Sequence, residues 1–190
     1  MTVVLDGKSL TIDQVHEVAR NHAVVELAPG ARAAVARCRK VAEDLMAKGE
    51  LIYGVTTGIG ELARVAVSGE QGEELQRRII RSHSAGVGRY FAEDQVRAAM
   101  LLRANVLARG YSAVRPLILE TLIAMLNRNV VPAVNEKGSV GTSGDLTSLA
   151  QIGCVLMGEG SAFLAGRIVG GREAMARAGL PPVTRSCQEG

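Results

Sequence analysis

Aromatic residues are scarce in this chain of 190 residues. Tryptophan is absent, and aromatic residues make up 3% of a sequence that is 47% hydrophobic. β-Sheets draw on aromatic and β-branched residues, whereas Ala, Leu, Arg and Glu favour helices. Because Ala, Val, Leu, Arg and Glu dominate, the composition predicts helices packed on helices. A chain of this length can bury one sizeable core, so a single domain is expected.

Cysteine is also rare, with Cys38, Cys154 and Cys187 far apart in the chain. No two of them have the spacing of a Cys-x-x-Cys pair or of a zinc site, so the sequence predicts no metal site. An odd number of cysteines without pairing favours a reducing compartment. The N-terminus shows neither the basic nor the apolar segment of a secretory signal, and together these features predict a cytoplasmic protein.

Long runs of one kind of residue are missing as well. No uninterrupted apolar run approaches the length needed to span a membrane. The 22 basic and 19 acidic residues are interspersed and give a net charge of +3. Because there is no basic run, nucleic acid is not expected as a partner. The sequence therefore favours neither a membrane nor a nucleic acid as the binding partner.

Glycine is abundant, with 22 residues, and two glycines flank a threonine-serine pair in the segment 141–146 (Gly-Thr-Ser-Gly-Asp-Leu). The amide nitrogen of Gly144, with no Cβ beside it, can attack the carbonyl carbon of Thr142. Loss of water closes a five-membered ring, and loss of the Ser143 hydroxyl leaves an exocyclic methylidene. The product, 4-methylideneimidazol-5-one (MIO), is an electrophile made from the backbone. A Ser-Gly pair alone is weak support, because Ser143 can equally be a helix N-cap.

Three further blocks support this chemistry. They are 53–60 (Tyr-Gly-Val-Thr-Thr-Gly-Ile-Gly), 81–88 (Arg-Ser-His-Ser-Ala-Gly-Val-Gly) and 103–116 (Arg-Ala-Asn-Val-Leu-Ala-Arg-Gly-Tyr-Ser-Ala-Val-Arg-Pro). With 138–150 and 158–160 (Gly-Glu-Gly), they have the order and spacing found in the aromatic amino acid ammonia-lyases. The chain closely resembles the histidine, phenylalanine and tyrosine ammonia-lyases and the related aminomutases over essentially all of its length.

The resemblance implies an all-α fold, a bundle of long helices with irregular active-site loops of the ammonia-lyase and fumarase/aspartase type. Residues 1–190 are expected to form a single N-terminal helical domain that carries the MIO loop. Because members of the family are much longer, the chain would be a fragment, a cleaved product or one subunit of a split enzyme. The family also implies a homotetramer in which several subunits contribute to each active site.

The resemblance assigns MIO to the triad Thr142-Ser143-Gly144, formed autocatalytically and without an external cofactor. Taking a proton from the Cβ of an α-amino acid needs an electron sink, which the ring supplies when the substrate amine, or in a rival scheme the substrate ring, adds to it. Gly144 and Asp145 would open a helix whose free amides face developing negative charge. Asp145 would brace the loop or cap this helix. The family usually has Ala in place of Thr142, but only the carbonyl of that residue enters the ring.

Tyr53 matches the tyrosine that handles the Cβ proton in the family. A free phenol has a pKa of about 10, too high for a good base at neutral pH, so nearby positive potential would be needed. Gly54, Gly58 and Gly60 would let this loop carry the tyrosine inward. A tyrosine packed in a loop for structural reasons is the alternative. The family usually reads Asn-Thr-Gly-Phe-Gly where this chain has Thr-Thr-Gly-Ile-Gly at 56–60.

His83 bears on the choice of substrate, because this stretch lies against the substrate side chain in the family. The Ser-His pair at 82–83 resembles the histidine-lyase pattern. Tyrosine-lyases usually have His-Leu, and phenylalanine-lyases Phe-Leu, one place earlier, while some tyrosine aminomutases also carry Ser-His. An imidazole can hydrogen-bond a substrate imidazole or a phenol, so His83 leaves both substrates open.

The resemblance therefore implies a carbon–nitrogen lyase that removes ammonia non-oxidatively from an aromatic L-amino acid, with conversion of histidine to urocanate favoured. Tyrosine ammonia-lyase or tyrosine 2,3-aminomutase activity is the alternative, because lyase and mutase share their first half-reaction. A non-catalytic subunit or helical scaffold that keeps the motifs as structure is a further alternative.

Apolar periodicity, caps and turn residues predict the elements. Residues 11–14 fit a helix capping box. Residues 51–69 and 132–141 are expected to be loops, and a turn flanked by short strands is expected around 163–169. Helices are predicted at about 12–19, 31–48, 70–85, 92–109, 115–129, 143–157 and 171–178.

Overall fold

Helices dominate the computed structural model, which describes residues 1–67, 69–141 and 144–183. Thr142 and Ser143 of the predicted triad thus lie outside the described residues. The helices are α1 (Ile12–Arg20), α2 (Pro29–Ala47), α3 (Gly69–His83), α4 (Glu93–Ala108), α5 (Pro116–Asn127), α6 (Leu146–Leu156), α7 (Gly171–Arg177) and the short 3₁₀ helix η1 (Gly60–Leu62). The predicted helices are confirmed, with ends that shift by at most three residues.

Short strands accompany the helices. They are β1 (Thr2–Leu5), β2 (Val24–Leu27), β3 (Val87–Tyr90), β4 (Val131–Pro132), β5 (Asn135–Lys137), β6 (Ser161–Leu164) and β7 (Arg167–Gly170). β1 and β2 are parallel and joined through α1, β3 pairs antiparallel with β5, and β4, β6 and β7 form a three-stranded antiparallel sheet in that order. The β6–β7 hairpin confirms the predicted strand pair, while the sequence analysis missed β1 to β5.

Local sequence explains where the helices begin. The Thr11 hydroxyl accepts a hydrogen bond from the Gln14 amide at 3.3 Å, and the Gln14 side chain accepts one from the Thr11 amide at 3.0 Å. This is the predicted capping box of α1. α2 and α5 both begin at a proline, Pro29 and Pro116, because the first helical position needs no amide hydrogen.

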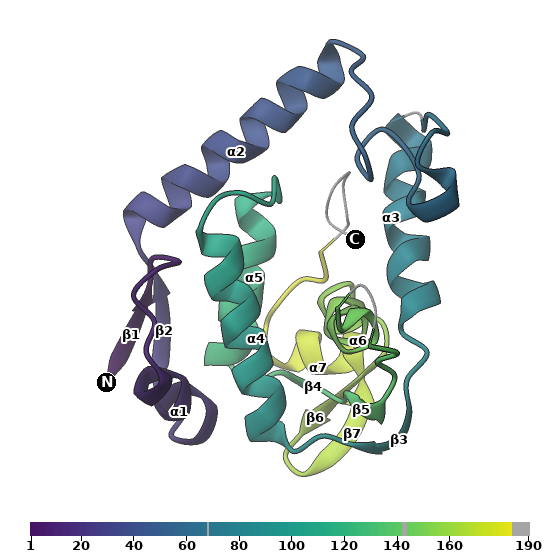
Figure 1. Cartoon of the computed structure of the whole chain (residues 1–190). Helices are drawn as coiled ribbons and strands as arrows, with labels where there is room; N and C mark the ends of the chain where they lie inside the picture. Colours follow the sequence, from purple (N-terminus) through teal and green to yellow (C-terminus); the bar gives the residue numbers. More distant parts are fainter. Residues whose placement is uncertain (68, 142–143, 184–190) are drawn as a thin grey trace.

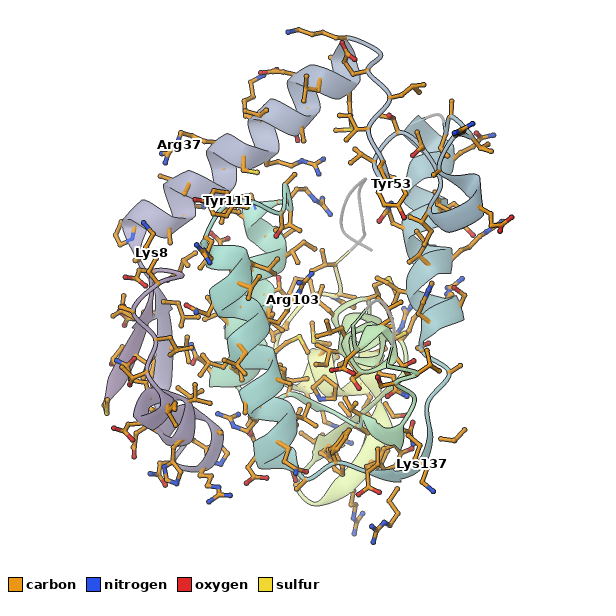
Figure 2. All side chains as sticks on the ribbon, in the orientation of Figure 1. Lys8, Arg37, Tyr53, Arg103, Tyr111 and Lys137 are labelled. Atoms are coloured by element: carbon orange, nitrogen blue, oxygen red, sulfur yellow. The ribbon has the colours of Figure 1, made fainter. Side chains whose placement is uncertain are left out.

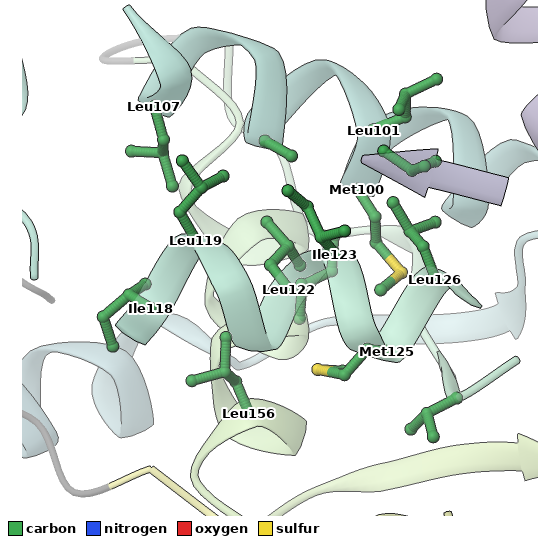
Figure 3. Close-up of a cluster of buried hydrophobic side chains, with 14 of the residues drawn as sticks. Met100, Leu101, Leu107, Ile118, Leu119, Leu122, Ile123, Met125, Leu126 and Leu156 are labelled. Carbon is green, nitrogen blue, oxygen red and sulfur yellow. The ribbon is translucent and has the colours of Figure 1, made fainter. Parts of the chain in front are cut away.

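The main core lies between α4 and α5 (Figure 3). Met100 and Leu101 of α4, and Leu119 and Met125 of α5, are fully buried. Leu156 of α6 packs against the same cluster. Apolar side chains of β1, β2 and α1 extend this core on the far side of α4. α4 is therefore the central element against which the other layers are assembled.

Arg97 of α4 is buried within this core and 1% exposed. Its Nε and Nη2 donate to the Val18 carbonyl at 3.2 and 2.8 Å. Its Nη1 donates to the Leu126 carbonyl at 3.0 Å and to Asn129 Oδ1 at 2.9 Å. The guanidinium thus donates to carbonyls near the C-terminal ends of α1 and α5, where the intrahelical hydrogen bonds run out.

Figure 1 shows how the elements are arranged. α4 and α5 lie in the middle, with the β1–α1–β2 unit on one side and α6 and α7 on the other. α2 runs from the end of β2 along one side, and α3 stands on the opposite side beyond α6.

Where the chain leaves α4, Gly110 has φ +74°, and a Cβ there would lie 2.7 Å from the Ala34 carbonyl carbon of α2. Only glycine allows this approach.

None of the helices within the described residues is both long enough and apolar enough to cross a lipid bilayer.

Candidate active site

A cavity of about 470 Å³ opens between α3, α4, α5 and α6. Tyr53 lines it from the loop before α3, His83 from the last turn of α3, and Leu146 and Leu149 from the first turns of α6. The structure therefore brings together three of the segments that the sequence predicts to be functional. Arg103 of α4 lines the same cavity. Figure 2 shows Tyr53 and Arg103 on opposite sides of the space between α3 and α4.

Tyr53 is 62% exposed, and its hydroxyl oxygen accepts a hydrogen bond from the Gly60 amide at 3.2 Å. Gly60 begins η1 with φ +57°, a conformation that glycine adopts without strain. This places the predicted catalytic tyrosine and the predicted loop glycine in direct contact. The donated amide hydrogen puts positive potential beside the phenol oxygen.

Two threonines shape the loop that carries Tyr53. The Thr56 hydroxyl accepts from the Ile52 amide at 2.8 Å and donates to the Glu50 carbonyl at 2.7 Å. Thr57 is buried and accepts from the Gly54 amide at 3.2 Å. In this loop, threonine hydroxyls therefore make hydrogen bonds with backbone groups that a helix or strand would pair with other backbone groups. The threonine pair fits this loop although the family usually has Asn-Thr there.

His83 is held by the helix that ends with it. Its Nδ1 lies 2.7 Å from the Ile79 carbonyl oxygen and 3.1 Å from the Ser82 hydroxyl. A carbonyl can only accept, so we assign the proton to Nδ1. The other ring nitrogen, Nε2, is then an acceptor. His83 can thus present a defined acceptor to a ligand in the cavity it lines.

The start of α6 closes another side of the cavity. Gly144 has φ +79°, two residues before the helix begins. Asp145 occupies the N-cap position, but its side chain makes no capping hydrogen bond, so the capping role predicted as one alternative is not seen. Instead, Thr147 donates to the Gly138 carbonyl at 3.0 Å and holds the incoming loop on the helix. The first amides of α6 have no intrahelical partner and form the positive end of its dipole.

Three charged residues near the cavity were missed by the sequence analysis. Arg81 of α3 makes a two-pronged ion pair with Glu159, at 2.8 Å from Nε and 2.6 Å from Nη2. Glu159 follows α6, so this pair ties the helix of His83 to the helix that follows the triad. The pair lowers the pKa of Glu159 and raises that of Arg81. Both residues, like Arg103, fall inside the sequence blocks, which was the available signal.

Across the described ranges 1–67, 69–141 and 144–183, no group of three or more His, Cys, Asp or Glu side chains is placed to hold a metal ion.

The order of these sites along the chain agrees with a known family. The family model described as aromatic amino acid lyase matches residues 10–190. The chain belongs to the aromatic amino acid lyase family. The resemblance predicted from the sequence blocks is therefore confirmed.

Individual lyases and aminomutases show how close the similarity is. Histidine ammonia-lyase of Alkaliphilus metalliredigens is 48% identical over 188 residues, which cover 99% of this chain and 37% of that protein. The tyrosine aminomutase structure from Streptomyces globisporus matches with a TM-score of 0.94 at 40% identity, covering 100% of this chain and 35% of that one. Treponema denticola ergothionase, in complex with desmethyl-ergothioneine sulfonic acid, matches with a TM-score of 0.96 at 30% identity, over 100% and 38% of the two chains.

These matches confirm the predicted fold class, the helix-rich class of the lyases and aminomutases. They also show that this chain spans a little over a third of the length of its relatives, 37% in the Alkaliphilus lyase. Most of the length of these relatives therefore lies outside the part that this chain matches.

Proposed function

We propose that this chain carries the MIO-forming part of an ammonia-lyase that removes ammonia from an aromatic L-amino acid, with histidine as the favoured substrate. The observation that carries the proposal is the shared cavity. It receives Tyr53, His83 and the first turns of α6, the helix that directly follows the triad. In this proposal the cavity is lined by a proton-transfer group (Tyr53), a residue that contacts the substrate side chain (His83) and the positive N-terminal end of a helix (α6).

The residues of the triad segment fit the proposed cofactor. Gly144 holds a left-handed φ, and a Cβ built on Gly141 or Gly144 meets nothing within 4 Å, so the limit there is backbone conformation rather than room. Thr142, Ser143 and Gly144 would supply MIO, which offers an electrophilic methylidene and an electron sink to a bound amino acid. The unpaired amides at the start of α6 would stabilise negative charge that develops beside them.

Within this proposal the side chains have separate roles. Tyr53 would take the proton from Cβ, and the Gly60 amide that donates to its oxygen at 3.2 Å would stabilise negative charge there. His83 would orient the substrate ring through Nε2, because Nδ1 is engaged by the Ile79 carbonyl. Asp145 would brace the loop, since it makes no capping bond.

Sequence identity supports histidine as the substrate. The Alkaliphilus histidine ammonia-lyase is 48% identical to this chain, against 40% for the Streptomyces tyrosine aminomutase. Tyrosine ammonia-lyase or 2,3-aminomutase activity is the second candidate, because the aminomutase structure has a TM-score of 0.94 and a phenol can also bond His83.

Two further proposals concern the whole protein. The family resemblance supports a homotetramer, which light scattering of the complete enzyme tests. Cys38 is a free thiol, which supports a reducing, cytoplasmic location.

The test uses a reconstituted lyase, which we define as this chain co-expressed with the part of the Alkaliphilus histidine ammonia-lyase outside the aligned region. The intact mass of the chain should fall by two water molecules, and Ser143→Ala should abolish that loss. Product formation is then measured with histidine, tyrosine and phenylalanine. A purified complex with an unchanged mass and no product would contradict the proposed function and favour a scaffold. Turnover of tyrosine over histidine would favour the second candidate.

A further inference from the structure

Arg103 is a charged residue that lines the cavity, and the proposed function assigns it no role. Its side chain is half-buried, and it makes no hydrogen bond or ion pair with any residue in the described part of the chain. Burial is the cause that lowers its pKa, with no acidic group acting against it. A partly desolvated cation without a counter-ion is unfavourable unless something completes the site.

Arg97, six residues earlier on α4, is an arginine whose guanidinium is hydrogen-bonded within this chain at each of its nitrogens. Arg97 is more deeply buried than Arg103, yet three acceptors take hydrogen bonds from it. The same helix therefore contains one arginine that this chain satisfies and one that it leaves open. The difference indicates that the partner of Arg103 comes from outside these residues.

The surroundings of Arg103 are apolar. Leu107, Ile118, Leu122 and Ile152 line the same cavity from α4, α5 and α6. At its edge, Leu146 and Leu149 remain 45% and 37% exposed. Exposed leucines beside an open apolar cavity mark a surface that another protein segment covers.

We propose that Arg103 anchors an apolar segment that carries an aspartate or glutamate, and that this segment belongs to the part of the lyase outside these 190 residues. Its apolar side chains cover the leucines of the cavity, and its carboxylate pairs with the guanidinium in the bidentate geometry that arginine favours. The inference goes beyond the proposed function and depends only on membership of the family, of which this chain spans 37% in the Alkaliphilus lyase.

A substrate carboxylate is the other anion that could fill the site. Tyr53 and Arg103 lie on opposite sides of the space between α3 and α4 (Figure 2). A small amino acid held at Tyr53 leaves the exposed leucines of α6 uncovered, whereas a protein segment covers them and neutralises Arg103 together. The combination of apolar wall and single charge therefore favours the protein segment.

The test compares variants in the reconstituted lyase. The concentration at which the two chains separate is measured by dilution and mass photometry. Arg103→Met should raise it roughly tenfold or more, because it leaves a carboxylate buried without a partner. Arg103→Lys should have an intermediate effect. Arg167→Met is the matched control, since Arg167 is an exposed arginine at the start of β7 and outside the cavity.

A second measurement separates docking from simple misfolding. In the 190-residue chain alone, Arg103→Met removes an unpaired charge, so the midpoint of thermal unfolding should stay the same or rise. The proposal is overturned if the wild-type chains form no complex, if Arg103→Met leaves their separation unchanged, or if it unfolds the isolated chain. A raised KM with unchanged separation assigns Arg103 to the substrate instead. A complex that forms without mass loss leaves docking intact and contradicts only the proposed function.

Discussion

Tyr53 can be tested by removing a single oxygen atom. Its hydroxyl oxygen faces the Gly60 amide at 3.2 Å at the edge of the cavity. Tyr53→Phe removes the group proposed to take the Cβ proton but keeps the ring. The kcat of the reconstituted lyase for histidine should therefore fall roughly 100-fold or more with little change in KM.

Tyr111→Phe is the matched control for this experiment. Tyr111 is also exposed, but its ring packs on Arg109 at 5.6 Å rather than in the cavity. Steady-state kinetics should show a near-normal kcat. Equal losses in the two variants would contradict a catalytic role for Tyr53.

His83 determines specificity in the proposed site. The Ile79 carbonyl fixes Nδ1 and leaves Nε2 to accept from a substrate N–H or O–H. His83→Leu should lower kcat/KM for histidine by roughly 10- to 100-fold and affect phenylalanine much less, because phenylalanine offers no such hydrogen. Competition assays with both amino acids measure the ratio. A uniform loss for both substrates would show that His83 only supports the fold.

At the residue scale, much of the candidate site could be predicted from the sequence. Tyr53, His83 and the first turns of α6 do line one cavity. Tyr53 and His83 could be singled out in the sequence because a phenol and an imidazole can transfer protons or form hydrogen bonds with a substrate. Arg103 could not be singled out, since its significance lies in the absence of a partner. A missing contact has no signature in the sequence and requires coordinates.

At the element scale, helices were predictable and most strands were not. The helices carry their own signals, such as the Thr11 capping box and the prolines that begin α2 and α5. β1 to β5 are two to four residues long. Pairing partners as distant as β3 and β5 supply the hydrogen bonds, so tertiary contact decides these strands. Among the strands in the described ranges, only β6 and β7 are joined by a tight local turn, with Ala165 and Gly166 both at positive φ.

The Arg81–Glu159 ion pair connects α3 with the segment that follows α6. It links the last turn of α3 to Glu159, three residues after the end of α6, with Nη2 and Oε1 at 2.6 Å. Glu159→Gln should therefore lower the midpoint of thermal unfolding modestly, because both groups are partly exposed. The same substitution should also lower the kcat of the reconstituted lyase by more than the small loss of stability alone would cause, because α3 positions His83.

The effect of this pair should depend on pH. Arg81 lowers the pKa of Glu159 in the folded chain. The carboxylate thus stabilises the fold above its ordinary pKa of about 4.3, and this contribution is lost as pH falls through the lower folded value. Thermal melts of wild type and Glu159→Gln should converge below about pH 4. A constant difference down to pH 3 would contradict the assignment.

At the scale of the whole molecule, the chain builds one wall of a site and leaves the other open. α4 organises this wall, because it packs on α1, α2 and α5 and carries both Arg97 and Arg103. Family membership was predictable from four ordered blocks. The segment that we propose to cover the cavity was not predictable, because a sequence gives no information about residues outside it.

The integrity of this wall should depend on Arg97 more than on any surface arginine. Arg97→Met removes the donors of the Val18 carbonyl and one donor of the Leu126 carbonyl, which keeps the Asn129 amide at 3.3 Å, so the free energy of unfolding should fall by about 2–4 kcal/mol. Arg20→Met is the control, since Arg20 makes only an exposed ion pair with Asp94 at 3.0 Å and should cost less than about 1 kcal/mol. Urea unfolding of the 190-residue chain measures both. Similar losses would mean that the buried guanidinium does not join α1 to α5, because a joining role requires that its removal cost more than that of a surface charge.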